Sequence, residues 1–463
     1  MNAPVFWIFL PAGVSIILFF TPRERTRYFF FVAASMLFTV SAFIIRIDPT
    51  SEMSFFEIAM SSELRILGRS FLLTEEDQFL VQVVYSLNAL WGIFSYFFRR
   101  YSRVVPLGLL FSAMLLAAYS VTPFLYAALI IELAIILSVP ILHDNQNSKT
   151  RGISRYMIYE TLALPFILLA GWFLAGGEIT PVNPAQLVQA TLLLGLGFIL
   201  WLGVFPFHSW ISLLYRESET INLGYILQLF ISISFLIMLK FINGFSWLRQ
   251  YGLFFEALLI LGAIMEALGA LGLFLQKNLK DINGYALLHL VGMLMTTLGI
   301  YSYSDITILP HMFAIFFIAL SLLHITIEFV HTSGRNTNIF LQQKEDVKLV
   351  AVLGYVYALL VISGMPLTIG FTPVQWIYQT LAPNHAIAFW MLIGSKTLIS
   401  ITAIRLLKRI YEIPISLQDL MPKKIKDWAL LLLLVFTVLA GLFPSFIFSK
   451  FDQLVSGFEN LIQ

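Results

Sequence analysis

The chain contains no cysteine, which excludes disulfides, thiolate metal sites and cysteine-ligated iron–sulfur clusters within it. Charged residues are scarce as well, at 12% of 463 residues, and the formal net charge is +2. Without lysine- or arginine-rich blocks, the sequence does not indicate nucleic acid as a partner. It also lacks a phosphate-binding loop, nicotinamide and flavin motifs, and histidine–carboxylate clusters with metal-ligand spacing on one helix. We therefore expect no cofactor, metal or catalytic centre in this chain, and we assign any redox chemistry to other subunits.

Apolar residues dominate what is present. Hydrophobic residues make up 59% of the chain, 43 residues are phenylalanine, and the mean hydropathy is +0.87. A water-soluble domain of this length cannot bury so much apolar surface, so the composition predicts a polytopic membrane protein in contact with a lipid bilayer. The N-terminal apolar segment has neither a basic region before it nor a small-residue cleavage site, which favours a retained span over a signal peptide.

Apolar windows of about 20 residues predict an all-α protein with about fourteen transmembrane helices. The windows are 4–21, 28–45, 78–98, 104–120, 122–142, 156–176, 187–217, 221–243, 253–275, 282–302, 308–330, 348–381, 386–409 and 426–448. Two of them exceed the length of one straight span and contain helix breakers. Pro206 interrupts 187–217, while Pro366 and Gly370 interrupt 348–381. We expect both to be broken helices.

The distribution of charge in the loops predicts the orientation. Basic residues gather on the odd-numbered loops, at Arg23, Arg25, Arg27, Arg99, Arg100, Arg103, Lys149, Arg151, Arg155, Lys408, Arg409, Lys423, Lys424 and Lys426. These loops should face the cytoplasm, because cytoplasmic loops carry an excess of lysine and arginine. The segment from Asp48 to Asp77 on the opposite side is acidic, through Glu52, Glu57, Glu63, Glu75 and Glu76. With an even number of spans, both termini are expected outside the cytoplasm.

The two interrupted spans occupy similar places in two five-helix stretches, residues 104–243 and 253–409. This indicates an internal repeat, and because five is odd, the second copy would be inverted in the membrane. Discontinuous helices in related halves of a transporter line a polar pathway near the middle of the bilayer. Residues 1–103 would then form the N-terminal transmembrane helices, and residues 410–463 the C-terminal loop and the last transmembrane helix. The alternative is that proline and glycine are simply common in membrane helices.

Several segments resemble motifs of one known family, the antiporter-like membrane subunits of respiratory complex I, which are shared with multisubunit cation/proton antiporters and membrane-bound hydrogenases. The segment similar to the family's PFHTW motif is Pro206-Phe207-His208-Ser209-Trp210, and the end of the following helix is Leu239-Lys240-Phe241. Segments similar to Q-x-D-L-K-R-x-x-A-Y-S and G-x-P-P-x-x-G-F begin at Gln276 and Gly364. The first of these departs from the family pattern at Asn278, Asp281, Gly284 and Ala286. Gly68-Arg69-Ser70-Phe71 is a weaker match.

The resemblance implies a file of charged residues that this sequence only partly retains. Glu132 matches the glutamate of the family's fifth helix, where it pairs with a lysine of the broken seventh helix. Counting back from Pro206, that lysine position holds Trp201. Similar counting places Ser232 or Ile233 at the eighth-helix lysine, Val374 at the charge of the second broken helix, and Ile315 at a further lysine. These losses leave pumping by this subunit open.

A different polar set remains inside the predicted spans. The candidates for a proton path are Glu132, Glu266, His289, His311, His324 and Lys396. Ionisable side chains at membrane depth cost roughly 2.5–3.5 kcal/mol on insertion scales and are usually kept for function. Contacts between subunits would equally explain Glu266 and Lys396, and packing with satisfied ring nitrogens explains the three histidines more readily than a proton path. His208 is expected to order the helix break, and structural roles near span ends are expected for Glu160, Glu256, Lys280 and Glu328.

The expected function is therefore that of a membrane subunit in a complex I-like, redox-driven assembly that translocates protons or cations. Its partners would be other membrane subunits of a complex I-like, hydrogenase or antiporter assembly, in a bacterial or archaeal cell membrane. The chain would be a non-redox part of an NADH:quinone oxidoreductase-type translocase. Two alternatives stay open, namely a structural scaffold without transport and a stand-alone cation/proton antiporter.

Overall fold

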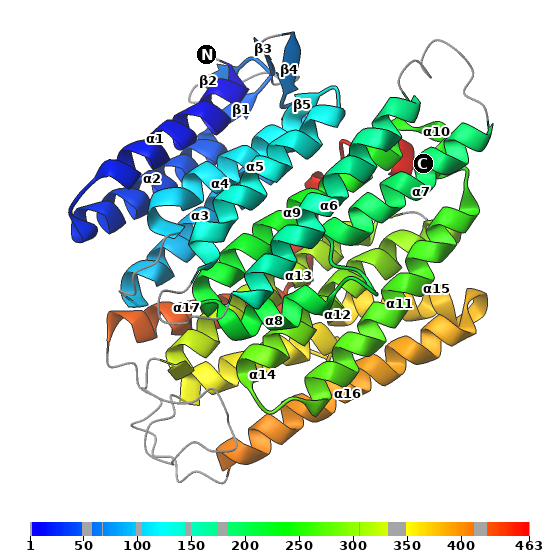
Figure 1. Ribbon diagram of the computed structural model, residues 1–463. Helices are drawn as coiled ribbons and strands as arrows, with labels where there is room; N and C mark the ends of the chain where they lie inside the picture. Colours follow the sequence, from blue (N-terminus) through cyan, green and yellow to red (C-terminus); the bar gives the residue numbers. More distant parts are fainter. Residues whose placement is uncertain are drawn as a thin grey trace. The chain divides into compact units, whose positions relative to one another are not determined.

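The structure is a computed structural model of the chain (Figure 1). It describes residues 2–48, 58–66, 68–98, 104–143, 150–174, 184–304, 306–331, 349–411 and 424–462. Of the loop residues used to predict orientation, Glu52, Glu57, Arg99, Arg100, Arg103, Lys149 and Lys423 lie outside these ranges. The chain forms two compact units. The first contains Met1–Gly203, Tyr225–Leu248 and Ser456–Phe458, and the second contains Val204–Gly224, Arg249–Val455 and Glu459–Gln463.

Ten helical segments in the described ranges are long and apolar enough to cross a membrane. They correspond to α2 (Glu24–Ile44), α3 (Gln78–Phe98), α5 (Leu125–Leu142), α6 (Arg151–Leu174), α9 (Thr220–Gly244), α11 (Gly252–Leu275), α12 (Leu279–Gly299), α13 (Leu309–His331), α16 (Ala386–Tyr411) and α17 (Ile425–Leu442). Four shorter apolar segments contain α1 (Leu10–Phe20), α4 (Val104–Ser120), α7 (Pro184–Trp201) and α14 (Leu349–Ser363). The remaining helices are α8 (Ser209–Glu217), α10 (Ser246–Arg249), α15 (Phe371–Asn384), α18 (Pro444–Phe451) and α19 (Glu459–Ile462). This pattern confirms an α-helical integral membrane protein.

The described part of the acidic segment also contains short strands, which the all-α expectation omits. The strand β1 (Ile45–Ile47), which directly precedes this segment, pairs in parallel with β2 (Ile58–Met60) inside it. A second sheet joins β3 (Glu63–Ile66), β4 (Arg69–Leu72) and β5 (Val121–Thr122) in antiparallel order. Apolar periodicity did not reveal these strands because each is only two to four residues long.

In the first unit, α9 packs through polar as well as apolar contacts. The hydroxyl oxygen of Tyr225 lies 2.6 Å from the carbonyl oxygen of Gly108 and 2.8 Å from Oδ1 of Asn88, and its single hydrogen is shared between these two acceptors. Trp91 donates from Nε1 to Oε1 of Gln228 at 3.1 Å. These hydrogen bonds connect α9 with α4 and α3, since buried polar groups in a membrane protein need internal partners.

Both expected helix breaks are confirmed. The helix α7 ends at Trp201 and α8 begins at Ser209, with Pro206 between them. Likewise α14 ends at Ser363 and α15 begins at Phe371, with Pro366 between them. Proline ends a helix because it has no backbone N–H and its ring clashes with the preceding turn.

Glycines make the second break compact. Gly364 has a φ of +69°, a left-handed conformation that favours glycine. A Cβ atom at Gly370 would lie 2.1 Å from the carbonyl oxygen of Val361, so the chain can return this close to the end of α14 only without a side chain there. The break thus depends on glycine as well as on proline.

Candidate functional site

Close packing of α11 against α12 in the second unit positions two of the candidate residues. A Cβ atom at Gly269 would lie 2.6 Å from the backbone nitrogen of His289, and one at Gly292 would lie 2.7 Å from that of Glu266. Small residues allow membrane helices to approach this closely. As a result Nδ1 of His289 lies 3.0 Å from the backbone carbonyl oxygen of Glu266.

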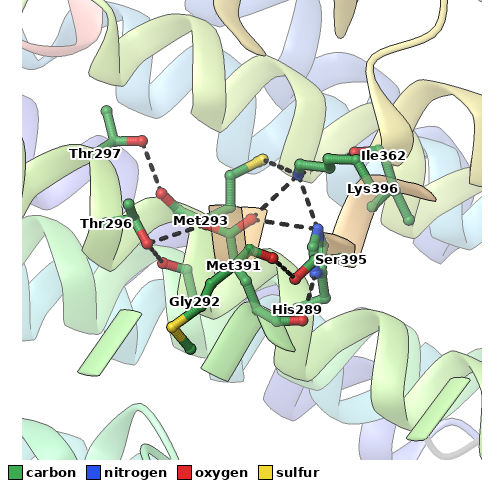
Figure 2. A network of polar contacts seen from close by, with 10 residues as sticks. His289, Gly292, Met293, Thr296, Thr297, Ile362, Met391, Ser395 and Lys396 are labelled. Carbon is green, nitrogen blue, oxygen red and sulfur yellow. Dashed lines mark hydrogen bonds and ion pairs between the residues drawn. The ribbon is translucent and has the colours of Figure 1, made fainter. Parts of the chain in front are cut away.

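Lys396 of α16 completes a buried cluster with these two residues. Its Nζ lies 2.8 Å from Nε2 of His289 and 3.3 Å from Oε2 of Glu266. Glu266 and His289 are 0% exposed, and Lys396 is 5% exposed. Figure 2 shows the lysine nitrogen directed toward His289 and toward the sulfur of Met293. We call Glu266, His289 and Lys396 the triad.

The hydrogen bonds define the proton arrangement on the histidine. A carbonyl oxygen can only accept, so Nδ1 of His289 donates to Glu266, and Nε2 of a neutral imidazole is then the acceptor. Lys396 donates to that nitrogen. The ring therefore holds the ammonium group in place, while the contact between Nζ and Oε2 of Glu266 is an ion pair. The hydroxyl of Thr296 lies 3.0 Å from the other carboxylate oxygen of Glu266 and 2.9 Å from the carbonyl oxygen of Gly292, and its single hydrogen is shared between them.

The second helix break supplies a further acceptor for Lys396. Its Nζ donates to the carbonyl oxygen of Ile362 at 3.1 Å. Ile362 lies in the last turn of α14, where carbonyls lack partners within the helix, and the residue four positions later is Pro366, which has no N–H to donate. The break thereby links the triad to a third segment of the second unit.

Burial alters two of the expected explanations. Contacts with another subunit do not account for Glu266 and Lys396, because the chain itself encloses both side chains. Glu160, expected near a span end within reach of water, is 0% exposed on α6, and neither of its carboxylate oxygens has a hydrogen-bond partner in the described part of the chain. The span-end expectation is therefore wrong for Glu160, and also for Glu328 of α13, which is 1% exposed, because both side chains lie on helix faces that pack against neighbouring helices.

Glu132 lies on α5 in the first unit, half-buried. Its Oε1 accepts a hydrogen bond from Thr161 at 2.8 Å, and its Oε2 is buried without a hydrogen-bond partner among the described residues. The carboxyl group of Glu160, on the neighbouring helix α6, is close enough to interact with it electrostatically. Two ionised carboxyl groups near each other in a low-dielectric site would repel, so replacing one of them removes an unfavourable interaction.

The other two candidate histidines lie apart from the triad. His324 of α13 donates from Nδ1 to the carbonyl oxygen of Leu320 at 2.7 Å, and the hydroxyl of Tyr215 donates to its Nε2 at 2.8 Å. His311 stacks on Phe448, with 4.0 Å between the ring centroids, and its Nε2 lies 2.9 Å from Oδ1 of Asp452. Both ring nitrogens of His324 are thus hydrogen-bonded, as in a packing histidine, whereas Nδ1 of His311 is buried without a hydrogen-bond partner among the described residues.

The residues at the family's lost charge positions are all buried. Trp201 packs edge-on against Phe198, with 5.7 Å between the ring centroids. Ser232 donates to the backbone oxygen of Gln228, and Val374 faces Gly364 across the second break. At the first break, His208 immediately precedes α8 and its ring stacks on Phe205. None of these residues contacts the triad through a hydrogen bond or ion pair in the described part of the chain.

Sequence reasoning named all three members of the triad but not their association. They lie on three helices, and His289 and Lys396 are 107 residues apart in the sequence. No spacing rule connects positions so far apart. Thr296 and Ile362 were missed entirely. A signal for Ile362 exists, since a proline four residues after a helical residue leaves that residue's carbonyl without its usual donor.

Comparison with known proteins gives one distant curated relative, and no family model matches the chain. The relative is NADH-ubiquinone oxidoreductase chain 2 of Locusta migratoria, 22% identical over 309 residues, which cover 63% of this chain and 81% of that one. Sequence identity at this level does not establish a family for this chain.

Solved structures match nearly the whole chain. A chain of the membrane-bound sulfane sulfur reductase, an archaeal respiratory membrane complex, has a TM-score of 0.82 at 14% identity, covering 100% of this chain and 98% of that one. A chain of the Mrp complex from Dietzia sp. has 0.80 at 13%, covering 100% and 97%. A chain of respiratory complex I from Thermus thermophilus has 0.74 at 15%, covering 96% and 98%.

These matches define the class of protein. The chain is an α-helical integral membrane protein, and it has the fold found in membrane complexes of the complex I, Mrp and sulfane sulfur reductase types. The resemblance to antiporter-like membrane subunits, drawn from the PFHTW-like and neighbouring motifs, is thereby confirmed at the level of the fold.

Proposed function

We propose that the chain is a membrane subunit of a complex I-like assembly that moves protons or other cations, and that the triad is its proton-handling site. The observation that carries this proposal is the ion pair of Glu266 and Lys396, enclosed within the second unit and hydrogen-bonded to His289. The fold shared with chains of three membrane complexes supports the assembly part of the proposal.

A structural role alone is a weak explanation for such a pair. Desolvating two charges costs several kcal/mol per ion, and buried ion pairs can often be replaced by apolar side chains without loss of stability. A pair kept at membrane depth is more simply explained by proton transfer, for which Nζ of Lys396 and Oε2 of Glu266 lie 3.3 Å apart. It would take over the role of the family charges replaced by Trp201 and Val374.

The proposal includes a topology. All fourteen apolar segments span the bilayer, residues 104–243 and 253–409 form inverted repeats, and both termini lie outside the cytoplasm. The position of the break in the fourth helix of each stretch supports the repeat. Because the chain has no cysteine, Arg65→Cys and Arg151→Cys are clean probes. A membrane-impermeant maleimide should label the first in intact cells and the second only after lysis, and the reverse pattern would refute the orientation.

The function is tested in vesicles that contain the complete assembly. Glu266→Gln and Lys396→Met should each reduce proton uptake, measured by quenching of a pH-sensitive acridine dye, at least tenfold. Arg405→Gln serves as the matched control, because it removes a positive charge from the same helix at a side chain that donates instead to the carbonyl oxygen of Phe274. Uptake unchanged in both triad variants, with the subunit still assembled, would reject the site.

A scaffold without transport is the second candidate, and Trp201, Ser232 and Val374 at the family's charge positions favour it. It predicts that Glu132→Gln, Glu266→Gln and Lys396→Met all leave proton movement unchanged while assembly persists. A stand-alone cation/proton antiporter is the third. Its distinguishing result would be cation-dependent proton flux in liposomes that contain this chain alone.

A further inference from the structure

A cavity of about 570 Å³ lies in the first unit, where α4, α6, α7 and α9 have their ends. Its lining is apolar and aromatic apart from a few polar side chains, and Lys240 is the one charged residue among the lining residues. The volume falls within the ~300–1,000 Å³ range of sites that hold small amphiphilic molecules. The triad does not use this cavity, whose lining belongs entirely to the first unit.

Lys240 has no carboxylate partner within ion-pair distance in the described part of the chain. Its Nζ donates to the carbonyl oxygen of Tyr119 at 3.1 Å and lies 4.2 Å from the centre of the tyrosine ring. The nearby carboxylate of Asp77 is already engaged, because it accepts from the Tyr119 hydroxyl at 2.8 Å and from Thr74. The ammonium group therefore retains donor capacity toward an incoming anion.

The walls of the cavity suit hydrocarbon. The rings of Phe124 and Phe241 lie 5.0 Å apart, and those of Phe241 and Phe245 lie 4.5 Å apart, which gives a continuous aromatic surface. Tyr119 and Trp247 complete the lining next to the ends of α4 and α9. Tyrosine and tryptophan gather where membrane helices meet the headgroup region, so a cation here lies at headgroup depth.

We propose that this cavity binds an anionic phospholipid, with the phosphate on Lys240 and an acyl chain against the aromatic wall. The positive charge of Lys240 determines which class of lipid the cavity favours. A single ammonium group that lines an apolar cavity, with no carboxylate at ion-pair distance among the described residues, complements a lipid with net negative charge. A zwitterionic lipid would also bring its own cation close to Lys240.

Gly244 provides a way to fill the cavity without disturbing the fold. It lines the cavity, and a Cβ atom built there meets no other atom within 4 Å. Gly244→Leu should therefore occupy the space of the acyl chain and leave Lys240 in place. Lys240→Gln removes the charge and keeps a donor for the carbonyl oxygen of Tyr119.

The test measures lipid retention by the full-length chain in mild detergent, using native mass spectrometry with dioleoyl phosphatidylglycerol or dioleoyl phosphatidylcholine. We expect the unmodified chain to retain the anionic lipid about tenfold better. Lys240→Gln should lower its retention to that of phosphatidylcholine, and Gly244→Leu should reduce retention of both lipids at least fivefold. Arg69→Gln is the matched control, because Arg69 also stacks on a tyrosine, Tyr126, in the same unit but does not line the cavity.

Three results would overturn the proposal. They are equal retention of the two lipids by the unmodified chain, unchanged phosphatidylglycerol retention in both variants, and displacement of the lipid by millimolar inorganic phosphate, which would indicate a plain anion site. Thermal unfolding of each variant checks that it is folded. If Lys240→Gln does not fold, the proposal is still tested by Gly244→Leu and by the comparison of the two lipids on the unmodified chain.

Discussion

Lys396 donates a hydrogen bond to the carbonyl oxygen of Ile362, four residues before the proline that interrupts the second broken helix. An ordinary helix would use that carbonyl for its own backbone. Pro366 cannot supply the donor, so the oxygen is left for a side chain from α16. The helix break is in this way part of the triad's surroundings, and the break and the charged site can be tested together.

Pro366→Ala should weaken the triad while leaving the chain assembled. The new backbone N–H can bond to Ile362, which removes one of the acceptors of the ammonium group. Loss of a hydrogen bond to a charged group is worth about 1.5–3 kcal/mol, so we expect proton uptake to fall roughly tenfold or more. Pro383→Ala is the control, since it removes a proline from inside α15, where no hydrogen bond to Lys396 is involved. Equal effects of the two substitutions would show that the freed carbonyl is unimportant.

Gly370→Ala should prevent the second break from closing. The added methyl group would lie 2.1 Å from the carbonyl oxygen of Val361, a distance that only backbone movement can relieve. We expect a lower unfolding temperature in detergent, or no folded protein. At Gly394 in α16 a Cβ atom meets nothing within 4 Å. Gly394→Ala should therefore leave the unfolding temperature unchanged or raise it slightly, because alanine is more favourable than glycine inside a helix by about 0.5–1 kcal/mol.

The breaks at Pro206 and Pro366 could be predicted because proline acts locally, through its own missing N–H. The apolar windows located the helices for a similar reason, since a span needs about 20 apolar residues whatever it packs against. The pairings of β1 with β2 and of β4 with β5 could not be found in this way. They depend on segments brought together by the helices, and the strands are too short for a periodic signal.

The triad shows the same division between local and distant effects. Glu266, His289 and Lys396 were each recognisable as costly ionisable residues inside apolar windows. Their association depends on how closely α11 and α12 approach at Gly269 and Gly292, which is a property of packing in three dimensions. Burial of Glu160 was misjudged for a related reason, because distance along the chain from a span end says little about which neighbouring helix covers a side chain.

The ion pair of Glu266 and Lys396 should show strong coupling in a double-mutant cycle. Removing one partner leaves a buried charge without compensation, which typically costs about 3–5 kcal/mol. Glu266→Gln and Lys396→Met should therefore each lower the unfolding temperature in detergent, and the double variant should be more stable than additivity predicts. Additive effects would indicate that the two groups are not both charged in the folded chain.

Tyr215→Phe should destabilise the chain without affecting proton movement. It removes the donor to Nε2 of His324 and leaves that buried nitrogen unsatisfied, at a cost of about 1–3 kcal/mol. If His324 is a packing residue, proton uptake per assembled complex stays within twofold of the unmodified value. A large loss of uptake in a variant that assembles normally would instead place His324 on the proton path.

The last prediction concerns Glu132 and Glu160. Two carboxylates repel each other, whereas Glu266 and Lys396 of the triad attract each other. Glu132→Gln keeps an acceptor for Thr161 and removes one of the two acidic groups, so we expect the unfolding temperature to stay the same or rise. Glu160→Gln should have the same effect, and the unfolding temperature of the double variant should rise by less than the sum of the two single changes. Proton uptake then separates the functional roles. A loss in both single variants would assign the carboxyl pair to the path together with the triad, whereas unchanged uptake would restrict proton handling in this chain to Glu266, His289 and Lys396.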